Sequence, residues 1–406
     1  MNAASLHPPS HGGAGADLAG APIPSWALLD LHAYFSDRRN STTAACLTRD
    51  NKEIQVTIFP AHPPRVSYFC VHCRGEEPSG FAREPKIIAA DANVLLLRIS
   101  IGSRNAMLCP SLHEYYVYKA SGGADGAPPS LHLLPHPSLY FFYDEQAALL
   151  SRGAEFTVVA LRDDVSAFHR GSSERNVWTT KAVFVPPERQ QGSSGEEGFR
   201  FRHETSDVVT IGGEPGTVAF VDMWRGILLF DVLHGDPTLR YIRMPPQLIS
   251  PCTGYSSPVH TRDSAVVNGH FKVVEFLDKI MTVTGSHSGY INDGWVAATW
   301  SKEVFSPHEG SWCPGHKLES RDIHGNPQMM LERLYTGHPT LSLHDGDIFY
   351  LMTKVELRDN KAWVIAVDMS DGTLRGVAEF GAERALDVSL TYTQSRISEH
   401  LIMAPG

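Results

Sequence analysis

Residues 218–244, VAFVDMWRGILLFDVLHGDPTLRYIRM, constrain the fold more than any other stretch of this chain. Three strand-length runs rich in apolar residues occupy Val218–Trp224, Ile227–Leu233 and Thr238–Met244, and short turns at Arg225-Gly226 and His234–Pro237 separate them. Such runs, joined by turns of two and four residues, are typical of a β-meander of antiparallel strands. The stretch therefore predicts an all-β fold, and it contains no catalytic motif.

The two turns also predict how the strands pair. A two-residue first turn places Phe220 opposite Asp231, and a four-residue second turn places Asp231 opposite Arg240. Large apolar side chains then lie on both faces, with Phe230 on one and Phe220 on the other. Exposed apolar surface costs about 25 cal/mol per Å², so both faces need a cover. Antiparallel strands buried on both sides are typical of stacked propeller blades or of a sandwich interior.

A second three-strand unit near the C-terminus supports a repeated architecture. Its strands are expected at Asp347–Lys354, Ala362–Asp368 and Leu374–Phe380. Together with the strand clusters between and before them, the two units fit a period of roughly 40–55 residues, which is associated with propeller blades. We therefore predict a six-bladed β-propeller with irregular blades.

The propeller is expected to be a single domain over residues 25–406, with its core at about 218–300, after a disordered tail at 1–24. Helical periodicity is scarce, and Pro327–Tyr335 and Ser395–Ile402 are the best short helix candidates. Trp26–Phe35 is expected to be a strand or a short amphipathic segment. The remaining strands are expected at Thr42–Thr48, Glu53–Phe59, Arg65–His72, Lys86–Ala90, Ala92–Ile101, Glu114–Lys119, Ser130–Leu134, Ser138–Tyr143, Phe156–Arg162, Val177–Val185, Ala265–Phe276 and Trp295–Trp300.

Composition argues against several classes of function. The formal net charge of -10 opposes direct binding to nucleic acid, and no apolar run approaches the length of a membrane span. Residues 1–24 contain no Lys or Arg, so neither a secretory signal nor a transit peptide is expected. Six scattered cysteines suit a reducing compartment, and we expect a cytoplasmic or nuclear protein. The Asn40-Ser41-Thr42 glycosylation motif should then stay unmodified.

Two groups of residues could bind a metal. Cys70-Val71-His72-Cys73 has the spacing of half a zinc site or of a redox pair, but no second CxxC motif exists, and buried cysteines often simply pack. The second group is a loose set of histidines with one cysteine, whose spacing gives no specific support; surface or hydrogen-bonded histidines are the simpler interpretation. That set comprises His260, His270, His287, His308, His316, His324 and Cys313.

Motifs for catalysis are weak or missing. Gly285–Gly289 (GSHSG) has the residue types of a serine-hydrolase motif without their order, and no phosphate-binding loop is present. Propeller hydrolases can use carboxylates from separate blades, and the acids in or near predicted strands are Asp30, Asp222, Asp231 and Asp293. An ion pair with Arg240 is the simpler interpretation for Asp231. The sequence therefore assigns no catalytic, cofactor-binding or metal-binding residue, and no cofactor is expected.

Several segments resemble a plant family called domain of unknown function 1618. They are SWALLDLHAYF (Ser25–Phe35), PPRVSYFCVHC (Pro63–Cys73), VDMWRGILLFDVL (Val221–Leu233), LRYIRMP (Leu239–Pro245), VVNGHFKVVE (Val266–Glu275), AWVIAVDM (Ala362–Met369) and SRISEHL (Ser395–Leu401). The resemblance implies no activity and carries over no site residue. By its strand pattern the chain is also similar to the propeller regions attached to F-box proteins, but the helical F-box itself is not expected here.

Two functions remain open. The first is a non-catalytic module that binds another protein through loops such as Ser121–Pro129, Pro186–Gly198 and Ser306–Gln328. The alternative is a propeller-type hydrolase acting on a carbohydrate or lactone, with three carboxylates or a His/Asp metal cluster at one mouth of the channel. A nuclear regulator that contacts DNA is disfavoured by the acidic net charge.

Overall fold

The computed structural model describes residues 7–8, 23–102, 112–121, 127–137, 142–153, 155–162, 167–172, 178–182, 202–234, 239–246, 248, 258–283, 289–305, 311–325, 331–356, 359, 361–380 and 392–401. Nearly all of the predicted tail at 1–24, the whole of loop Pro186–Gly198 and most of the GSHSG segment lie outside these residues. Within the described part of the chain, no helix has the length and apolar character needed to cross a bilayer.

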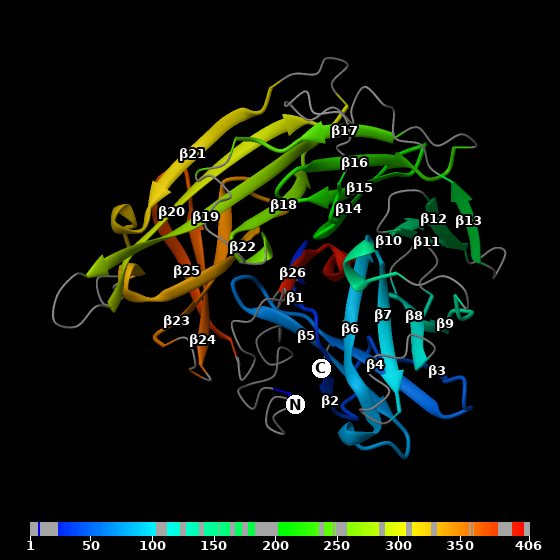
Figure 1. The fold of residues 1–406 in the computed structure, drawn as a ribbon. Helices are drawn as coiled ribbons and strands as arrows, with labels where there is room; N and C mark the ends of the chain where they lie inside the picture. The colour runs from blue at the N-terminus through cyan, green and yellow to red at the C-terminus, as the bar shows by residue number, and fades with distance from the viewer. Residues whose placement is uncertain are drawn as a thin grey trace. The chain divides into compact units, whose positions relative to one another are not determined.

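The fold is all-β, and its six small sheets are the blades of a six-bladed β-propeller, which confirms the predicted fold class (Figure 1). Five sheets contain four consecutive antiparallel strands each, in the orders β6-β7-β8-β9, β10-β11-β12-β13, β14-β15-β16-β17, β18-β19-β20-β21 and β22-β23-β24-β25. The first sheet has the order β26-β1-β5-β4-β3, with β2 also paired to β5. It therefore contains strands from both ends of the chain.

Most of the predicted strands are present in the structure. The first sheet comprises β1 (Ala27–Asp30), β2 (Tyr34–Phe35), β3 (Ala44–Leu47), β4 (Glu53–Phe59), β5 (Val66–Cys73) and β26 (Tyr392–Ser395). The next two sheets comprise β6 (Phe81–Asp91), β7 (Val94–Ile101), β8 (His113–Lys119), β9 (Ser130–Leu133), β10 (Ala147–Arg152), β11 (Glu155–Leu161), β12 (Ala167–Ser172) and β13 (Trp178–Ala182).

The last three sheets contain the two predicted meanders. They comprise β14 (Asp207–Gly212), β15 (Thr217–Asp222), β16 (Gly226–Asp231), β17 (Leu239–Arg243), β18 (Arg262–Val267), β19 (His270–Val283), β20 (Gly289–Glu303), β21 (Cys313–Glu319), β22 (Tyr335–Leu341), β23 (Ile348–Lys354), β24 (Ala362–Asp368) and β25 (Thr373–Phe380). Strands β19 and β20 pair with each other far beyond the residues that pair with β18 and β21, so they form a long two-stranded ribbon at one end of their blade.

Several sequence predictions need correction. The strand expected at Ala265–Phe276 is two strands, because Asn268-Gly269 forms a turn with both residues at positive φ. Among the described residues of the two helix candidates, the helical conformation is limited to short 3₁₀ turns at Leu331–Arg333 and Ile397–His400. In the segment Ser138–Tyr143, the described residues Phe142 and Tyr143 are not in a strand. Strands β10, β12, β14, β21, β22 and β26 were not predicted.

The described residues fall into two compact units, and the cores lie within each unit. One unit contains residues 1–30, 60–67 and 245–394, and the other contains 31–59, 68–244 and 395–406; strand β5 passes from the first to the second between Ser67 and Tyr68. The single domain over residues 25–406 stays a prediction.

The meander of residues 218–244 is buried on both faces, as predicted. All six residues of β15 are buried, and Phe230 and Val232 are 1% and 2% exposed. One face packs on the preceding blade, where Phe220, Leu228 and Phe230 join a core cluster with Ala148 and Val159. Both faces of the ribbon therefore contribute to the stability of the fold.

The predicted register of this meander is wrong. Strand β15 pairs Phe220 with Leu228 and Thr217 with Asp231, because three residues rather than two connect it to β16. The shift is odd, and side chains alternate between the faces of a strand, so Phe220 lies on the same face as Phe230. The second register shifts by an even number, with Leu229 opposite Arg240.

Candidate functional site

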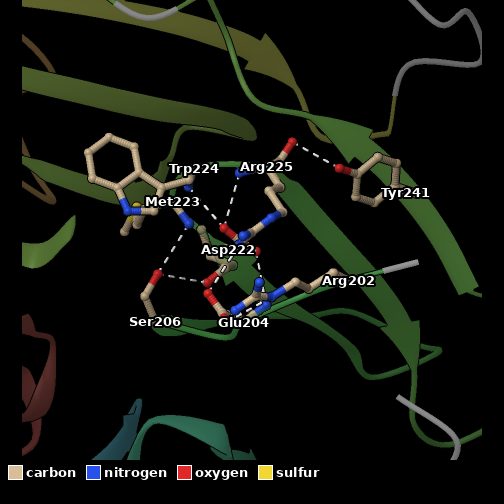
Figure 2. A network of polar contacts seen from close by, with 9 residues as sticks. Arg202, Glu204, Ser206, Asp222, Met223, Trp224, Arg225 and Tyr241 are labelled. Carbon is tan, nitrogen blue, oxygen red and sulfur yellow. Dashed lines mark hydrogen bonds and ion pairs between the residues drawn. The ribbon is translucent and has the colours of Figure 1, made fainter. Parts of the chain in front are cut away.

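The connection between β15 and β16 is organised by one buried carboxylate. Asp222, the last residue of β15, is 1% exposed. Its Oδ1 accepts hydrogen bonds from the backbone N–H groups of Trp224 and Arg225, both at 3.0 Å. Side-chain acceptance from residues two and three positions ahead is the bonding pattern of an Asx-type turn. We call residues Asp222–Gly226 the Asp222 turn (Figure 2).

The other carboxylate oxygen ties the turn to the segment that precedes β14. Asp222 Oδ2 accepts from the Glu204 backbone N–H at 2.9 Å and from Arg225 Nη1 at 2.9 Å. The same Arg225 nitrogen lies 3.2 Å from Glu204 Oε2, and Arg202 also donates to Glu204. Ser206 Oγ accepts the Met223 backbone N–H at 3.1 Å. Figure 2 shows these contacts converging on the turn from the Arg202–Ser206 segment.

Strand β17, the last strand of the same blade, contacts the other side of the turn. Tyr241 on β17 donates its hydroxyl to the Arg225 carbonyl oxygen at 2.9 Å. Gly226 begins β16 directly beneath this contact, and a Cβ at that position would lie 2.5 Å from both the Ile242 carbonyl oxygen and the Tyr241 hydroxyl. Only glycine permits this close approach of the strands.

The electrostatics of the Asp222 turn favour the ionised forms of its surface charges. The hydrogen bond from Arg202 holds the pKa of Glu204 below its usual range, although burial opposes this. Burial opposes the charge of Arg225 as well, but its hydrogen bonds with Asp222 and Glu204 hold the pKa of Arg225 above its usual value. Burial lowers the pKa of the adjacent His203 to about 4, against the attraction of Asp222. His203 is therefore neutral at pH 7.

In this arrangement the Asp222 carboxylate fixes the shape of the turn and is not available as a general base. Both oxygens of Asp222 already accept two hydrogen bonds each, so no lone pair is left to take a proton from a substrate. What the Asp222 turn presents to solvent is a half-buried Trp224 beside the charged side chains of Arg225, Arg202 and Glu204, which are 36%, 67% and 56% exposed. In Figure 2 the indole of Trp224 is directed away from the Asp222 carboxylate.

The carboxylates named from the sequence do not form a catalytic pair on this blade. Asp222 and Asp231 lie at opposite ends of β16, because Asp222 pairs with Gly226 and Thr217 with Asp231. Asp231 accepts a hydrogen bond from Thr217 Oγ1 at 2.5 Å and lies 3.5 Å from Arg240. The predicted Asp231–Arg240 ion pair is therefore confirmed, although the two residues are diagonal rather than opposite.

The thiols of Cys70 and Cys73 are not directed toward a common site. Both cysteines lie within β5, and residues three apart in a strand point to opposite faces of the sheet. Both thiols are buried and free, and burial raises the pKa of Cys70 to about 12. They are packing residues of the first blade.

The histidine set is not brought together either. In the described part of the chain, no group of three or more His, Cys, Asp or Glu side chains is placed to hold a metal ion. His287 and His308 lie outside the described residues. His260 instead contacts His338, which the sequence analysis did not select, with ring centroids 4.5 Å apart.

The residues of the Asp222 turn other than Asp222 were missed by the sequence analysis. Asp222 was selected only as a candidate acid. The signal was present in the order Asp-x-x-Arg-Gly, because an Asp that precedes a turn commonly accepts its own backbone N–H groups. The partners Arg202 and Glu204 lie about twenty residues earlier in the chain, and no local pattern connects them to the turn.

Comparisons with solved structures find matches of low similarity. Hydrazine synthase of Kuenenia stuttgartiensis is 12% identical with a TM-score of 0.34, and the match covers 83% of this chain and 78% of that chain. Dihydro-heme d1 dehydrogenase NirN is 9% identical with a TM-score of 0.33, covering 97% and 84%. A levansucrase mutant of B. megaterium is 8% identical with a TM-score of 0.31, covering 95% and 99%. At these scores the likenesses carry no argument about activity.

No curated protein sequence matches this chain. Residues 220–350 match the model of a family described as "Protein of unknown function (DUF1618)". This part of the chain contains the Asp222 turn, the long β19–β20 ribbon and the whole of three of the resembling segments, whereas the other four segments lie outside it. The chain therefore carries the DUF1618 family region at residues 220–350, and the family resemblance of its sequence is confirmed.

Proposed function

We propose that this protein is a non-catalytic interaction module that binds another protein. The observation that carries the proposal is the Asp222 turn. Its buried carboxylate uses all four of its hydrogen bonds to hold the backbone that presents Trp224 and Arg225. A polar network that fixes the shape of a surface, and leaves no acid or base free, fits recognition better than chemistry.

The residue types at the Asp222 turn support this proposal. Trp, Tyr and Arg are enriched among the residues that dominate binding energy at protein interfaces. A side chain held on a rigid turn loses little conformational freedom on binding, so more of its contact energy appears as affinity. The charges around Trp224 alternate in sign, with Glu204 between Arg202 and Arg225. This pattern favours a partner surface with an apolar pocket and charges of both signs at its rim.

The proposal also includes a location and a class of partner. The four cysteines that the structure describes are free thiols, which supports a partner in the cytosol or nucleus. The partner is a protein rather than a nucleic acid or a membrane, as the net charge of -10 favours.

The test is a purified complex whose stability depends on the Asp222 turn. A partner isolated by cross-linking from native extract would be purified and recombined with the wild-type chain, and the stoichiometry measured by light scattering. Trp224→Ala should weaken this complex by about 2 kcal/mol or more, which is roughly thirtyfold in Kd. Tyr335→Ala is a matched control, since it removes an aromatic ring that is 45% exposed on a different blade.

Equal affinities for the wild type and Trp224→Ala, with both variants folded by circular dichroism, would exclude the Asp222 turn as the recognition element. Absence of any stoichiometric complex, together with hydrolysis of a glycoside or lactone by the wild-type chain, would favour the hydrolase alternative.

A further inference from the structure

A polar pocket lies on the first blade, away from the Asp222 turn in the chain. Its volume is about 300 Å³, and the residues that line it come from three places in one unit. They are Asp37 and Arg39 after β2, Glu53 and Gln55 on β4, and His72 and Arg74 at the end of β5. The sequence analysis named His72 only as part of the CVHC motif and did not single out the other five.

The pocket is built by regular strand pairing on one side and by a crossing segment on the other. Gln55 pairs directly with His72, and the Arg74 N–H donates to the Glu53 carbonyl oxygen at 2.8 Å, so these side chains share one face of the sheet. Gln55 Nε2 donates to the Asp37 carbonyl oxygen at 3.2 Å, which holds the crossing segment against this face. The lining is therefore fixed by backbone contacts.

The charged side chains of the pocket do not neutralise one another. Within the described part of the chain, Asp37, Arg39, Glu53 and Arg74 make no ion pair and no side-chain hydrogen bond. Gln55 is 6% exposed, and its Oε1 has no hydrogen-bond donor among the same described residues.

Neighbouring charges behave differently. Lys52 pairs with Glu76, and the guanidinium of Arg49 lies 3.9 Å from Glu114. Charged side chains close to the pocket therefore form ion pairs, whereas the two cations and two anions that line it form none with one another. A ligand that brought its own charges of both signs would satisfy all four.

We propose that this pocket binds a peptide segment of the partner protein in which an acidic and a basic side chain are adjacent. Arg39 and Arg74 would receive the carboxylate, Asp37 and Glu53 the cation, and the Gln55 amide the peptide backbone. A ligand of one sign would meet as many repulsions as attractions. Because the four charged side chains are largely exposed, a small free molecule would stay mostly in water, so a segment anchored in a larger partner fits better.

This inference rests on the proposed function, and labelled peptides test it without a known partner. Fluorescence anisotropy of the full chain would compare short peptides of alternating glutamate and lysine, of glutamate alone and of lysine alone. The alternating peptide should bind about fivefold more tightly than either uniform peptide, and the difference should shrink at high salt. A free Glu-Lys dipeptide should bind more weakly than the alternating peptide.

Charge reversals in the pocket should redirect this preference. Arg39→Glu with Arg74→Glu should shift the preference toward the lysine peptide, and Asp37→Lys with Glu53→Lys toward the glutamate peptide. The matched control for the arginine pair is Lys317→Glu with Lys361→Glu, which makes the same change in net charge at exposed positions on other blades and should leave the preference unchanged.

Three results would overturn the inference: equal binding of the three peptides, a preference that the control pair shifts as much as the pocket variants do, or a dipeptide that binds as tightly as the alternating peptide. The two proposals fail separately. Loss of peptide preference with an intact effect of Trp224→Ala on the complex removes the pocket alone, and the converse result removes the Asp222 turn alone.

Discussion

A single buried carboxylate, that of Asp222, holds the backbone of the turn between β15 and β16. Asp222→Ala would leave the N–H groups of Glu204, Trp224 and Arg225 without their acceptor in a partly buried setting. An unsatisfied buried polar group costs about 1–3 kcal/mol, so we expect the free energy of unfolding to fall by about 2–4 kcal/mol, allowing for partial rehydration. Urea titration followed by tryptophan fluorescence measures this change.

Asp222→Asn separates the loss of charge from the loss of acceptors, since it keeps one oxygen and should cost less than Asp222→Ala. Asp371→Ala is the control, because Asp371 also lies in a turn but its side chain is 48% exposed. A loss for Asp222→Ala no larger than for this control would contradict the role assigned to the buried carboxylate.

The cysteines allow a second prediction for single residues. Burial raises the pKa of both Cys46 and Cys70 to about 12, so their thiolate populations at pH 7 are very small. Cys313 is exposed. Iodoacetamide at pH 7.5 should alkylate Cys313 in the folded protein well before Cys46, Cys70 or Cys73, as peptide mass spectrometry would show, and urea should remove the difference. Rapid alkylation of Cys70 and Cys73 together in the folded protein would contradict their burial on opposite faces of β5.

Strand β16 gives the clearest prediction for a single element, because its two faces are equally buried. Leu228 and Leu229 are adjacent, point to opposite faces, and are 0% and 1% exposed. Leu228→Ala and Leu229→Ala should each lower the free energy of unfolding by about 2–5 kcal/mol. Parallel urea titrations of the two variants test this, with Leu47→Ala as a control at a leucine that is 55% exposed. A sheet with one solvent face would lose stability in only one of the two variants.

The same element shows what the sequence could and could not predict. The apolar runs of residues 218–244 located three strands correctly, because alternation and turn residues are local signals. The register depends on whether two or three residues make the turn. The three-residue turn is held by the Asp222 side chain and by its contact with Glu204, about eighteen residues earlier, which no local pattern reveals. The Asp231–Arg240 pair was still found, since an even shift keeps both residues on one face.

Two of the strands that the sequence analysis missed share a physical reason. Strand β21, CPGHKLE, has mostly exposed side chains, and β22, YTGHPTL, contains glycine and proline. Neither reads as an apolar run, and both gain their strand conformation from backbone pairing with a neighbour. Tertiary pairing decides such strands, so local patterns do not reveal them.

At the scale of the whole molecule, the fold class follows from repetition, whereas the candidate sites do not. Two meanders with blade-like spacing were enough to predict a six-bladed propeller. The pocket of the first blade combines residues 37, 39, 53, 55, 72 and 74, whose types are ordinary for surface residues. Only the pairing of β4 with β5 and the crossing segment after β2 bring them together.

Acid should destabilise the molecule through histidines buried in both units. Burial lowers the pKa of His113 and His203 to about 4 and that of His338 to about 3, from a usual value of 6.5. Below pH 6.5 these histidines bind protons in the unfolded chain but stay neutral in the folded chain. Their contribution to stability is therefore complete above that pH and falls as the pH drops toward their pKa values in the folded protein.

The variant His338→Asn tests this, because it removes one such group and asparagine tolerates the positive φ of 53° at this position. Between pH 7.5 and 5 the wild type should lose about 1–2 kcal/mol more of its free energy of unfolding than this variant loses. Urea titrations at both pH values measure the difference. The contribution of the carboxyl groups to the change in stability with pH cancels, because both proteins contain the same carboxyl groups. The exposed His132→Asn should lose as much as the wild type; if His338→Asn does so too, His338 does not titrate as a buried group.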